Sequence, residues 1–418
     1  MKKILLGILA FSLLLGACKK DDTVNPEDKP DAKLIKVLDD YKSQLTGAQF
    51  GWKAYLMPDG GGVYSFLFKF DENERVQMLS DIDPSFEDAA FESSYRLKAI
   101  QRPSLFFDTY SYIHLLADPD RPFEGSYGTG QYSDFEFSFV SAKEDTITLE
   151  GNYNHSKLLL IKAKSQDEFD DFMGNIQAVA GNFSKLRTYF KRMTVGGVEY
   201  ELNINPAQKA ISFAYSDGGS IKSHSSFFYI DGNNVVLTDP FVNGGTTISS
   251  LSGVSYNASG FISASINGST VQIVEAIQPM SYDLNAASRF NSVERQYISY
   301  DGFTRDGNPD SYNIKSIPGL SFLLLWTKYS PSYDLAGFTF GNSIRYGPAV
   351  TPQVKSDGKV YYTFLGTLGS IPAAYRSIVL NTGNAFGEEQ SGFYVIQVSN
   401  NTYDLVSADD ARKWIRFE

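Results

Sequence analysis

The sequence is poor in the residues that build metal and disulfide sites. Its 418 residues include one cysteine, Cys18, and three histidines, His114, His155 and His224. A single cysteine cannot close an intramolecular disulfide, and no two histidines have the i, i+4 spacing of a helical zinc site. A Gly-x-Ser-x-Gly nucleophile elbow is missing, as is a glycine-rich loop followed by the lysine and helix that bind phosphate. We therefore expect no metal, no cofactor and no Ser–His hydrolase.

Basic residues are also fewer than acidic residues. The chain has 37 Lys and Arg residues against 48 Asp and Glu residues, which gives a formal net charge of −11. Proteins that bind nucleic acid need clustered basic side chains to displace counterions from the phosphates. The acidic and unclustered composition argues against nucleic acid as a partner. It also argues against attachment to a membrane through a polybasic surface.

The apolar segment Ile4–Leu15 is too short to span a bilayer and has the character of a signal peptide. Two lysines precede it, and it runs into Leu15-Gly16-Ala17-Cys18, which resembles the lipobox of bacterial lipoproteins. The resemblance implies that residues 1–17 are removed and that Cys18 becomes the lipidated first residue. The alternative is an ordinary secretory signal with a cysteine there by chance. A lone thiol at a cleavage site is otherwise hard to explain.

Residues 18–30 are polar, contain two prolines and show no hydrophobic periodicity, so we expect a disordered tether. Lys19-Lys20-Asp21-Asp22 resembles the charged tether that Bacteroidota lipoproteins use for display on the outer leaflet. An ordinary solvated linker is the alternative. We expect an outer-membrane protein, anchored through the lipid on Cys18 and displayed on the cell surface, with the periplasmic face left open as an alternative.

Aromatic residues, by contrast, are abundant: 31 Phe and 26 Tyr accompany 35 Gly, a profile typical of β-rich extracellular proteins. An amphipathic stripe predicts a helix over Asp31–Thr46, ended by Gly47. Alternating apolar and polar side chains then predict seven or eight antiparallel strands up to Lys162, among them Ser94–Ile100 and Leu105–Ala117. Residues 31–164 should thus form a first domain, a lipocalin-like barrel or strongly curved sheet with an N-terminal helix.

The second half of the chain continues the β pattern. The sequence predicts a helical connection over residues 165–189. We expect Gly174 and Gly181 to split this helix into pieces. Residues 190–418 form a second β-rich region, and whether it divides near residue 290 stays open. Within it the apolar run Leu320–Trp326 predicts a strand that is buried on both faces. The fold class is therefore mainly β.

Several segments resemble a family of uncharacterised Bacteroidota surface lipoproteins of unknown function. They are Gly51-Trp52-Lys53-Ala54-Tyr55, Tyr64–Phe70, Ser94-Tyr95-Arg96-Leu97, Phe107–Leu115 and Asp134-Phe135-Glu136-Phe137. The resemblance is good over the first domain and loose beyond it. It implies association with outer-membrane nutrient-uptake systems of SusC-like transporters and SusD-like binders. Because the family has no known chemistry, no site residue follows from it.

Five aromatic residues near the expected loops of the first domain could stack on sugar rings: Trp52, Tyr110, Tyr112, Tyr127 and Tyr132. Their alternative role is simply to fill the core. The leading hypothesis is an accessory component that binds a nutrient, a glycan in the first place, for an uptake system. The rivals are a glycoside hydrolase with paired carboxylates and a purely structural subunit. Two carboxylates about 5–9 Å apart in a cleft favour the enzyme; an aromatic platform without them favours the binder.

Overall fold

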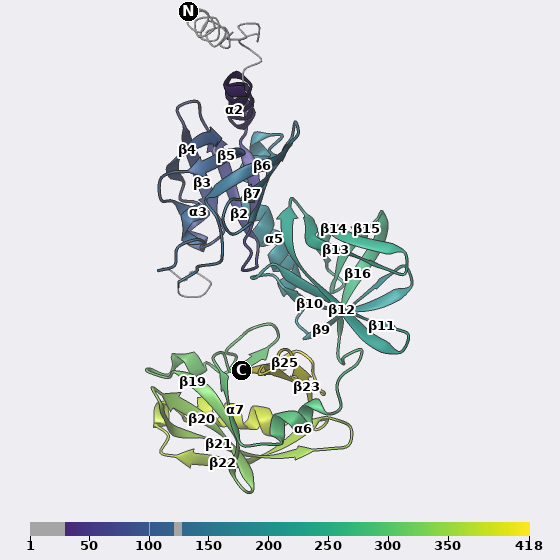
Figure 1. The fold of residues 1–418 in the computed structure, drawn as a ribbon. Coiled ribbons are helices and arrows are strands. Elements are labelled where there is room, and N and C mark those ends of the chain that lie inside the picture. Colours follow the sequence, from purple (N-terminus) through teal and green to yellow (C-terminus); the bar gives the residue numbers. More distant parts are fainter. Residues whose placement is uncertain (1–29, 100, 121–127) are drawn as a thin grey trace, which may run out of the picture. The chain divides into compact units, whose positions relative to one another are not determined.

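In the computed structural model of the chain, which describes residues 30–99, 101–120 and 128–418, the first unit is a closed antiparallel barrel (Figure 1). Its elements are α2 (Pro30–Thr46), β1 (Trp52–Met57), β2 (Tyr64–Phe70), β3 (Arg75–Ser80), the 3-10 helix η2 (Pro84–Phe86), β4 (Phe91–Ala99), β5 (Pro103–Phe107), α3 (Tyr112–Leu115), β6 (Glu136–Ala142), β7 (Thr146–Gly151), β8 (Lys157–Lys162) and α4 (Gln166–Asp170). Each strand pairs with the next, and β1 pairs with β8 to close the barrel. The predicted antiparallel barrel with an N-terminal helix is confirmed.

The interior of this barrel is filled with aromatic side chains. Phe68 lies between Phe66 and Phe107, with ring centroids 5.4 and 5.5 Å away, and all three side chains are buried. Helix α2 packs against β2, β4 and β5. It adds Leu45 to the core, and its Tyr41 stacks on Phe139 with the ring centroids 3.8 Å apart. In β3 and β7 the side chains alternate between buried and more exposed positions, whereas β1 and β2 are buried at nearly every position.

One predicted strand is wrong in its second half. The alternation over Leu105–Ala117 predicted a single strand, but β5 ends at Phe107 and α3 is a short helix. Ser111 begins this helix, with its Oγ 3.2 Å from Nδ1 of His114. Ile113 and Leu115 are then buried in the core. A single helical turn offers too few residues for its apolar spacing to be told from that of a strand.

A second closed barrel follows, preceded like the first by a helix. Its elements are α5 (Phe172–Ser184), β9 (Phe190–Val195), β10 (Val198–Asn205), β11 (Ala210–Asp217), β12 (Ser220–Asp231), β13 (Asn234–Asn243), β14 (Thr246–Asn257), β15 (Phe261–Ile266) and β16 (Ser269–Ala276). Strand β9 pairs with both β10 and β16, which closes the barrel. Helix α5 packs against β12 and β14.

The sequence predicted that the helical connection is broken at its two glycines, and this is wrong. The break falls at Asp171, between α4 and α5, whereas Gly174 and Gly181 both lie inside α5. A Cβ added at either glycine would meet no heavy atom within 4 Å, so neither marks a close packing contact. Glycine inside a helix costs only about 1 kcal/mol. The buried side of α5, which includes Ile176 and Phe183, offsets that cost.

The last part of the chain is a nine-stranded sheet in the order β17-β19-β20-β21-β22-β23-β24-β25-β18. Its elements are α6 (Ala286–Asn291), β17 (Arg295–Ser299), β18 (Phe303–Arg305), η3 (Ile314–Ser316), β19 (Phe322–Ser330), β20 (Tyr333–Phe340), β21 (Ser343–Val354), β22 (Val360–Gly369), η4 (Ala373–Tyr375), α7 (Arg376–Gly387), β23 (Phe393–Gln397), β24 (Tyr403–Ser407) and β25 (Lys413–Phe417). Helix α7 packs against β21 and β22, and α6 against β21 and β23. These helices and one face of the sheet enclose a common core.

Asp404 joins the second barrel to this sheet. Its side chain is fully buried on β24 and accepts two hydrogen bonds from Arg416, from Nε and Nη2, each 2.8 Å long. The phenol of Tyr189, next to the first residue of β9, donates a third bond of 2.7 Å. The backbone N–H of Tyr189 also donates to the carbonyl of Ala411, at 2.7 Å. The start of the second barrel is therefore tied to β24 and β25.

The chain divides into two compact units, the first ending at Asp170 and the second beginning at Asp171. The second unit contains both the second barrel and the nine-stranded sheet, with α6 between β16 and β17. The first unit has its own closed sheet and its own core, so it has what independent folding requires.

We expect residues 30–170 expressed alone to give a single cooperative melt, followed by far-UV circular dichroism. A matched chain of residues 31–164 should melt at a lower temperature, because it loses the carboxylate of Glu168 that pairs with the buried Lys53. Strand-like dichroism without a cooperative transition in the longer chain would show that its core is completed by the second unit.

Candidate ligand-binding site

The four predicted aromatic residues that lie in the described part of the chain do not form one site. Trp52 is buried in the core of the first barrel with no exposed surface, and its Nε1 donates to the carbonyl of Leu45 at 2.9 Å. The expectation that Trp52 stacks on a ligand is therefore wrong. Trp52 lies on β1 and its ring faces the interior of the barrel. It therefore has the alternative role, which is to fill the core.

Tyr112 is also a core residue. It is nearly buried, stacks on Phe86 with the ring centroids 4.2 Å apart, and its hydroxyl donates to the carbonyl of Ala89 at 2.8 Å. Tyr110, two residues earlier, is about half exposed, and its hydroxyl bonds to the carboxylate of Asp118. The ring of Tyr110 is thus accessible to a ligand, whereas the ring of Tyr112 packs in the core.

Tyr132 lines a pocket of about 480 Å³ in the first unit. The pocket is also lined by Phe135 and Tyr153, and the rings of all three are partly or largely exposed. Tyr132 therefore shares a pocket with two other aromatic residues, and its role in ligand binding stays a prediction. Tyr127 and the predicted lipidation site Cys18 lie outside the described residues.

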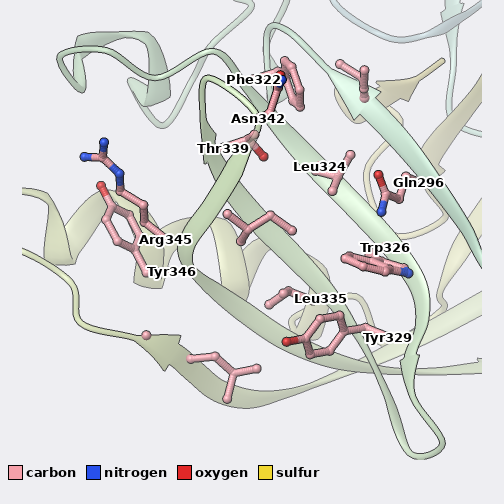
Figure 2. A pocket seen from close by; sticks show the side chains of 14 residues that line it. Gln296, Phe322, Leu324, Trp326, Tyr329, Leu335, Thr339, Asn342, Arg345 and Tyr346 are labelled. Atoms are coloured by element: carbon pink, nitrogen blue, oxygen red, sulfur yellow. The ribbon is translucent and has the colours of Figure 1, made fainter.

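A larger cavity, of about 700 Å³, lies on the nine-stranded sheet, on the face away from the core (Figure 2). We call it the sheet cleft. It is lined by Gln296, Ile298, Phe322, Leu324, Trp326, Tyr329, Leu335, Thr339, Asn342, Ile344, Arg345, Tyr346, Leu368 and Gly369. These residues come from β17 and from β19 to β22, including the turn between β20 and β21. None of them was predicted as a site residue.

Strand β19 shows how the sequence produces the cleft. Leu323 and Leu325 point into the core, while Phe322, Leu324 and Trp326 alternate with them and line the cleft. The run Leu320–Trp326 was predicted to be buried on both faces; Leu324 is buried as predicted, but Phe322 and Trp326 on the same face are only partly buried. The indole of Trp326 and the ring of Phe322 are both partly exposed. Continuous apolar character here reflects a core on one side and an apolar cavity on the other.

A β-bulge in β21 lies at one end of the same cleft. Phe338 pairs with Tyr346 but the next residue, Thr339, pairs with Ile344, so Arg345 has no partner on β20. In a regular strand Arg345 would face away from its two neighbours. The bulge allows three consecutive residues, Ile344 to Tyr346, to line one cavity. Bulges commonly re-aim a side chain in this way beside functional sites.

The aromatic edge of the cleft is held in place by its neighbours. Nε1 of Trp326 donates to a carboxylate oxygen of Glu294 at 2.9 Å, and the ring of Tyr329 meets the indole edge-on with the centroids 5.2 Å apart. Figure 2 shows Trp326, Tyr329 and Gln296 on one side of the cleft, and on the other side Arg345, whose guanidinium group points away from them. A ligand that contacts both sides would cross the cleft floor formed by Leu324 and its neighbours.

Polar groups in the cleft are few. Gln296 and Asn342 are exposed amides, which can both donate and accept hydrogen bonds. Thr339 is buried at the wall, and its Oγ1 has no hydrogen-bond partner among the described residues. Burial raises the pKa of Tyr346 above its usual value, so its phenol stays neutral. The cleft therefore combines an apolar floor, aromatic rings and a small number of hydrogen-bonding groups, as small-molecule sites do.

The family model described as a domain of unknown function, DUF4302, matches residues 23–255, which is more than half of the chain. The chain belongs to this family. The DUF4302 match covers the described part of the first unit and extends into β14 of the second barrel. The sheet cleft lies beyond the matched residues, so family membership says nothing of its role. No curated protein matches the chain.

Similar solved structures include the DNA polymerase III β subunit of Thermotoga maritima, with 10% identity, 91% of this chain and 95% of that chain covered, and a TM-score of 0.14. Another is the isotype 1 transferrin-binding protein B of serogroup B Neisseria meningitidis, with 9% identity, 88% and 73% covered, and a TM-score of 0.19. A third is the Helicobacter pylori β clamp in complex with diflunisal, with 8% identity, 92% and 96% covered, and a TM-score of 0.12. Scores this low carry no argument about the fold or function of the DUF4302 chain.

The described residues of this DUF4302 protein lack two further features. They contain no group of three or more His, Cys, Asp or Glu side chains placed to hold a metal ion. Among their helices, none is both long and apolar enough to cross a membrane.

Proposed function

We propose that this protein is a lipid-anchored cell-surface protein that binds a glycan as an accessory component of an outer-membrane nutrient-uptake system. The lipobox-like Leu15–Cys18 segment supports the anchor, and the resemblance to Bacteroidota surface lipoproteins supports the link to SusC-like and SusD-like partners. The sheet cleft is the proposed binding site.

The sheet cleft carries the proposal because its lining matches what a sugar presents. Pyranose rings have one apolar face, which packs on aromatic side chains, and a rim of hydroxyl groups. Trp326 and Tyr329 supply the rings, while Gln296 and Asn342 supply amides for the hydroxyl groups. The pocket at Tyr132 offers aromatic rings as well, but it is smaller, at about 480 Å³ against about 700 Å³.

Glycoside hydrolysis is less well supported at this site. It requires two carboxyl groups on either side of the scissile bond. The residues that line the cleft include no aspartate and no glutamate, and all of them lie in the described part of the chain. Glu294 reaches only the edge of Trp326, where its carboxylate accepts the indole N–H. Binding without turnover fits this lining better.

We expect Trp326→Ala to weaken glycan binding by about 2 kcal/mol, roughly thirty-fold, because it removes the principal stacking surface. Glycans would be identified on an array and their affinities then measured by isothermal titration. Tyr132→Ala is the matched control, since it removes a ring from the other pocket and should leave the affinity unchanged. If only Tyr132→Ala lowers the affinity for the glycan, the binding site lies in the first barrel instead. Cleavage products in the same samples would favour the hydrolase.

We expect Cys18→Ser to move the protein from the membrane fraction to the soluble fraction, because the lipid is attached at this sulfur. Several acyl chains on one cysteine, each methylene contributing about 0.8 kcal/mol, make a stable anchor. Fractionation followed by immunoblotting measures the distribution. If the serine variant still pellets with the membranes, the lipoprotein proposal is wrong. Pull-down of the wild type from solubilised outer membrane would identify its partners.

A further inference from the structure

We propose that Asp334 is a positioning residue for ligand binding in the sheet cleft, because its carboxylate holds the hairpin that carries Trp326 and Tyr329. Asp334 lies on the core side of the sheet: it pairs with the core residue Val350, whereas the next residue, Leu335, lines the cleft. The inference rests on the proposed function and deepens it, since it names a buried group on which the aromatic edge of the cleft depends.

The hairpin between β19 and β20 is irregular. The two strands pair regularly as far as Trp326 and Leu335, and the register then shifts before Ser330 pairs with Tyr333. Within this irregular stretch Lys328 has a φ of +53°, which is uncommon for a residue other than glycine. Regular pairing between β19 and β20 therefore does not hold the segment that follows Trp326.

The carboxylate of Asp334 supplies a contact in its place. Its Oδ1 accepts a hydrogen bond of 2.7 Å from the backbone N–H of Lys328. Asp334 is only 1% exposed, so water competes little for this oxygen. A hydrogen bond to an ionised acceptor is about twice as strong as one between neutral groups. The carboxylate thus fixes the backbone at the left-handed residue.

Lys328 lies between the two rings of the aromatic edge. Trp326 precedes it by two residues and Tyr329 follows it directly, and their ring centroids are 5.2 Å apart (Figure 2). Trp326 is also held by its own hydrogen bond to Glu294, so Tyr329 is the ring that depends more on the backbone of Lys328. A change of conformation at Lys328 would alter the angle between the two rings, and with it the surface that a ligand meets.

The charge of Asp334 sets the strength of this contact. Its Oδ2 has no hydrogen-bond partner among the described residues, so this oxygen can carry a proton while Oδ1 keeps its bond to Lys328. Burial raises the pKa of Asp334 from 3.8 to about 6, while the N–H and the ammonium group of Lys328 favour its ionised form. Tyr362 on β22, a second titratable group near this carboxyl, stays neutral because burial and the charge of Asp334 raise its pKa.

The sign of the effect on binding follows from these contacts. A ligand that packs on Trp326 and Tyr329 favours the ordered hairpin, and therefore the hydrogen bond between Lys328 and Asp334. It cannot desolvate Asp334 much further, because this side chain is already buried. Since the ionised carboxylate is the stronger acceptor, ligand binding and ionisation favour each other. The affinity should therefore rise as the pH increases through about 6.

The test compares the wild type with Asp334→Asn, Asp334→Ala and Thr382→Ala on the full chain. Asparagine keeps an oxygen that can accept from Lys328 but has no proton to lose, whereas alanine removes the acceptor. Thr382 is a buried residue of α7 that does not line the cleft, and its hydroxyl donates to the carbonyl of Ile378. Its alanine variant therefore controls for the loss of a buried polar side chain. Amide hydrogen exchange over β19 and β20 is measured without ligand, and affinities for maltohexaose, laminarihexaose and xylohexaose are measured by titration between pH 5 and pH 7.

We expect Asp334→Ala to exchange the Lys328 amide about ten-fold faster than the wild type and to bind the oligosaccharide about ten-fold more weakly. Asp334→Asn and Thr382→Ala should exchange this amide like the wild type. The wild type should bind about five-fold more tightly at pH 7 than at pH 5, whereas the affinity of Asp334→Asn should not change with pH. If the alanine variant does not fold, this difference between the pH profiles decides the matter.

Unchanged exchange in Asp334→Ala, an equal loss of affinity in Thr382→Ala, or a wild-type affinity that is independent of pH would overturn the inference and leave glycan binding standing. If the wild type binds no glycan, the proposed function fails. The exchange rates measured without ligand then support or refute the role of Asp334 in the hairpin by themselves.

Discussion

Asp404→Asn is expected to destabilise the second unit by about 3 kcal/mol, because an amide cannot replace a buried carboxylate that accepts three hydrogen bonds. Asp404 is fully buried and receives the two Arg416 donors and the Tyr189 hydroxyl. An amide keeps the volume but presents N–H groups where one of its oxygens stood. At least one of the three donors would then lose its acceptor, and Arg416 would lose its counter-charge.

Chemical denaturation of residues 30–418 at pH 7, followed by tryptophan fluorescence, would measure the loss. Trp414 is a local reporter, since its ring lies 5.5 Å from that of Tyr189. Asp217→Asn is the matched control: Asp217 pairs with Lys222, and both side chains are more than half exposed. Exposed pairs contribute little, so this variant should behave like the wild type. Equal stability of all three proteins would mean that Asp404 does not hold the junction together.

Asp334→Asn is expected to act in the opposite direction and to stabilise the protein at neutral pH by about 2 kcal/mol. Asp334 is a buried aspartate on β20 that accepts one hydrogen bond, from the backbone N–H of Lys328 at 2.7 Å. Its Oδ2 has no hydrogen-bond partner among the described residues. Burial raises its pKa from 3.8 to about 6. The folded protein therefore disfavours the ionised carboxylate at neutral pH.

The sign of the pH dependence follows from that raised pKa. The unfolded chain releases the proton near pH 4, whereas the folded chain holds it until about pH 6. The contribution of Asp334 to stability is therefore most favourable below pH 4 and falls as the pH rises from about 4 to about 6, by up to about 3 kcal/mol. The asparagine variant has no such proton, so its advantage should appear over this interval and vanish at pH 4. Calorimetric melts of both proteins at pH 4, 5, 6 and 7 measure it; a difference that does not change with pH would contradict this account.

The architecture could be predicted because each barrel is built from local hairpins. In β2, Tyr64, Phe66 and Phe68 share the inner face, and this period of two is visible in the sequence without any knowledge of partners. The prediction failed where local pattern is ambiguous, as at α3, where one helical turn follows β5. It failed again at Gly174 and Gly181, where tertiary packing of α5 outweighs the weak preference of glycine against helices.

The sheet cleft could not be predicted from local pattern, because its residues come together only through the pairing of five strands. Gln296 and Arg345 lie on β17 and β21, and no single-sequence signal gives the order of these strands in the sheet. The bulge that turns Arg345 is a register shift of one residue, invisible in the sequence. The run Leu320–Trp326 was the available signal. Its alternate residues could have been interpreted as the lining of a cavity instead of a second buried face.

Most of the described strands have partners on both edges, and β22, which pairs with β23 at Val360 alone, is the longest exception. Both barrels close on themselves, and the outer strands of the nine-stranded sheet, β17 and β18, have five and three residues. The N–H and carbonyl of Ile298 on β17 are already bonded to Glu418 at 2.8 and 2.9 Å. Long open edges are templates on which further copies add into fibres, a hazard that grows when many copies are crowded together. If copies of this protein are packed densely at a cell surface, as proposed, the exposed strand edge most open to pairing would be that of β22, which pairs with β23 at Val360 alone.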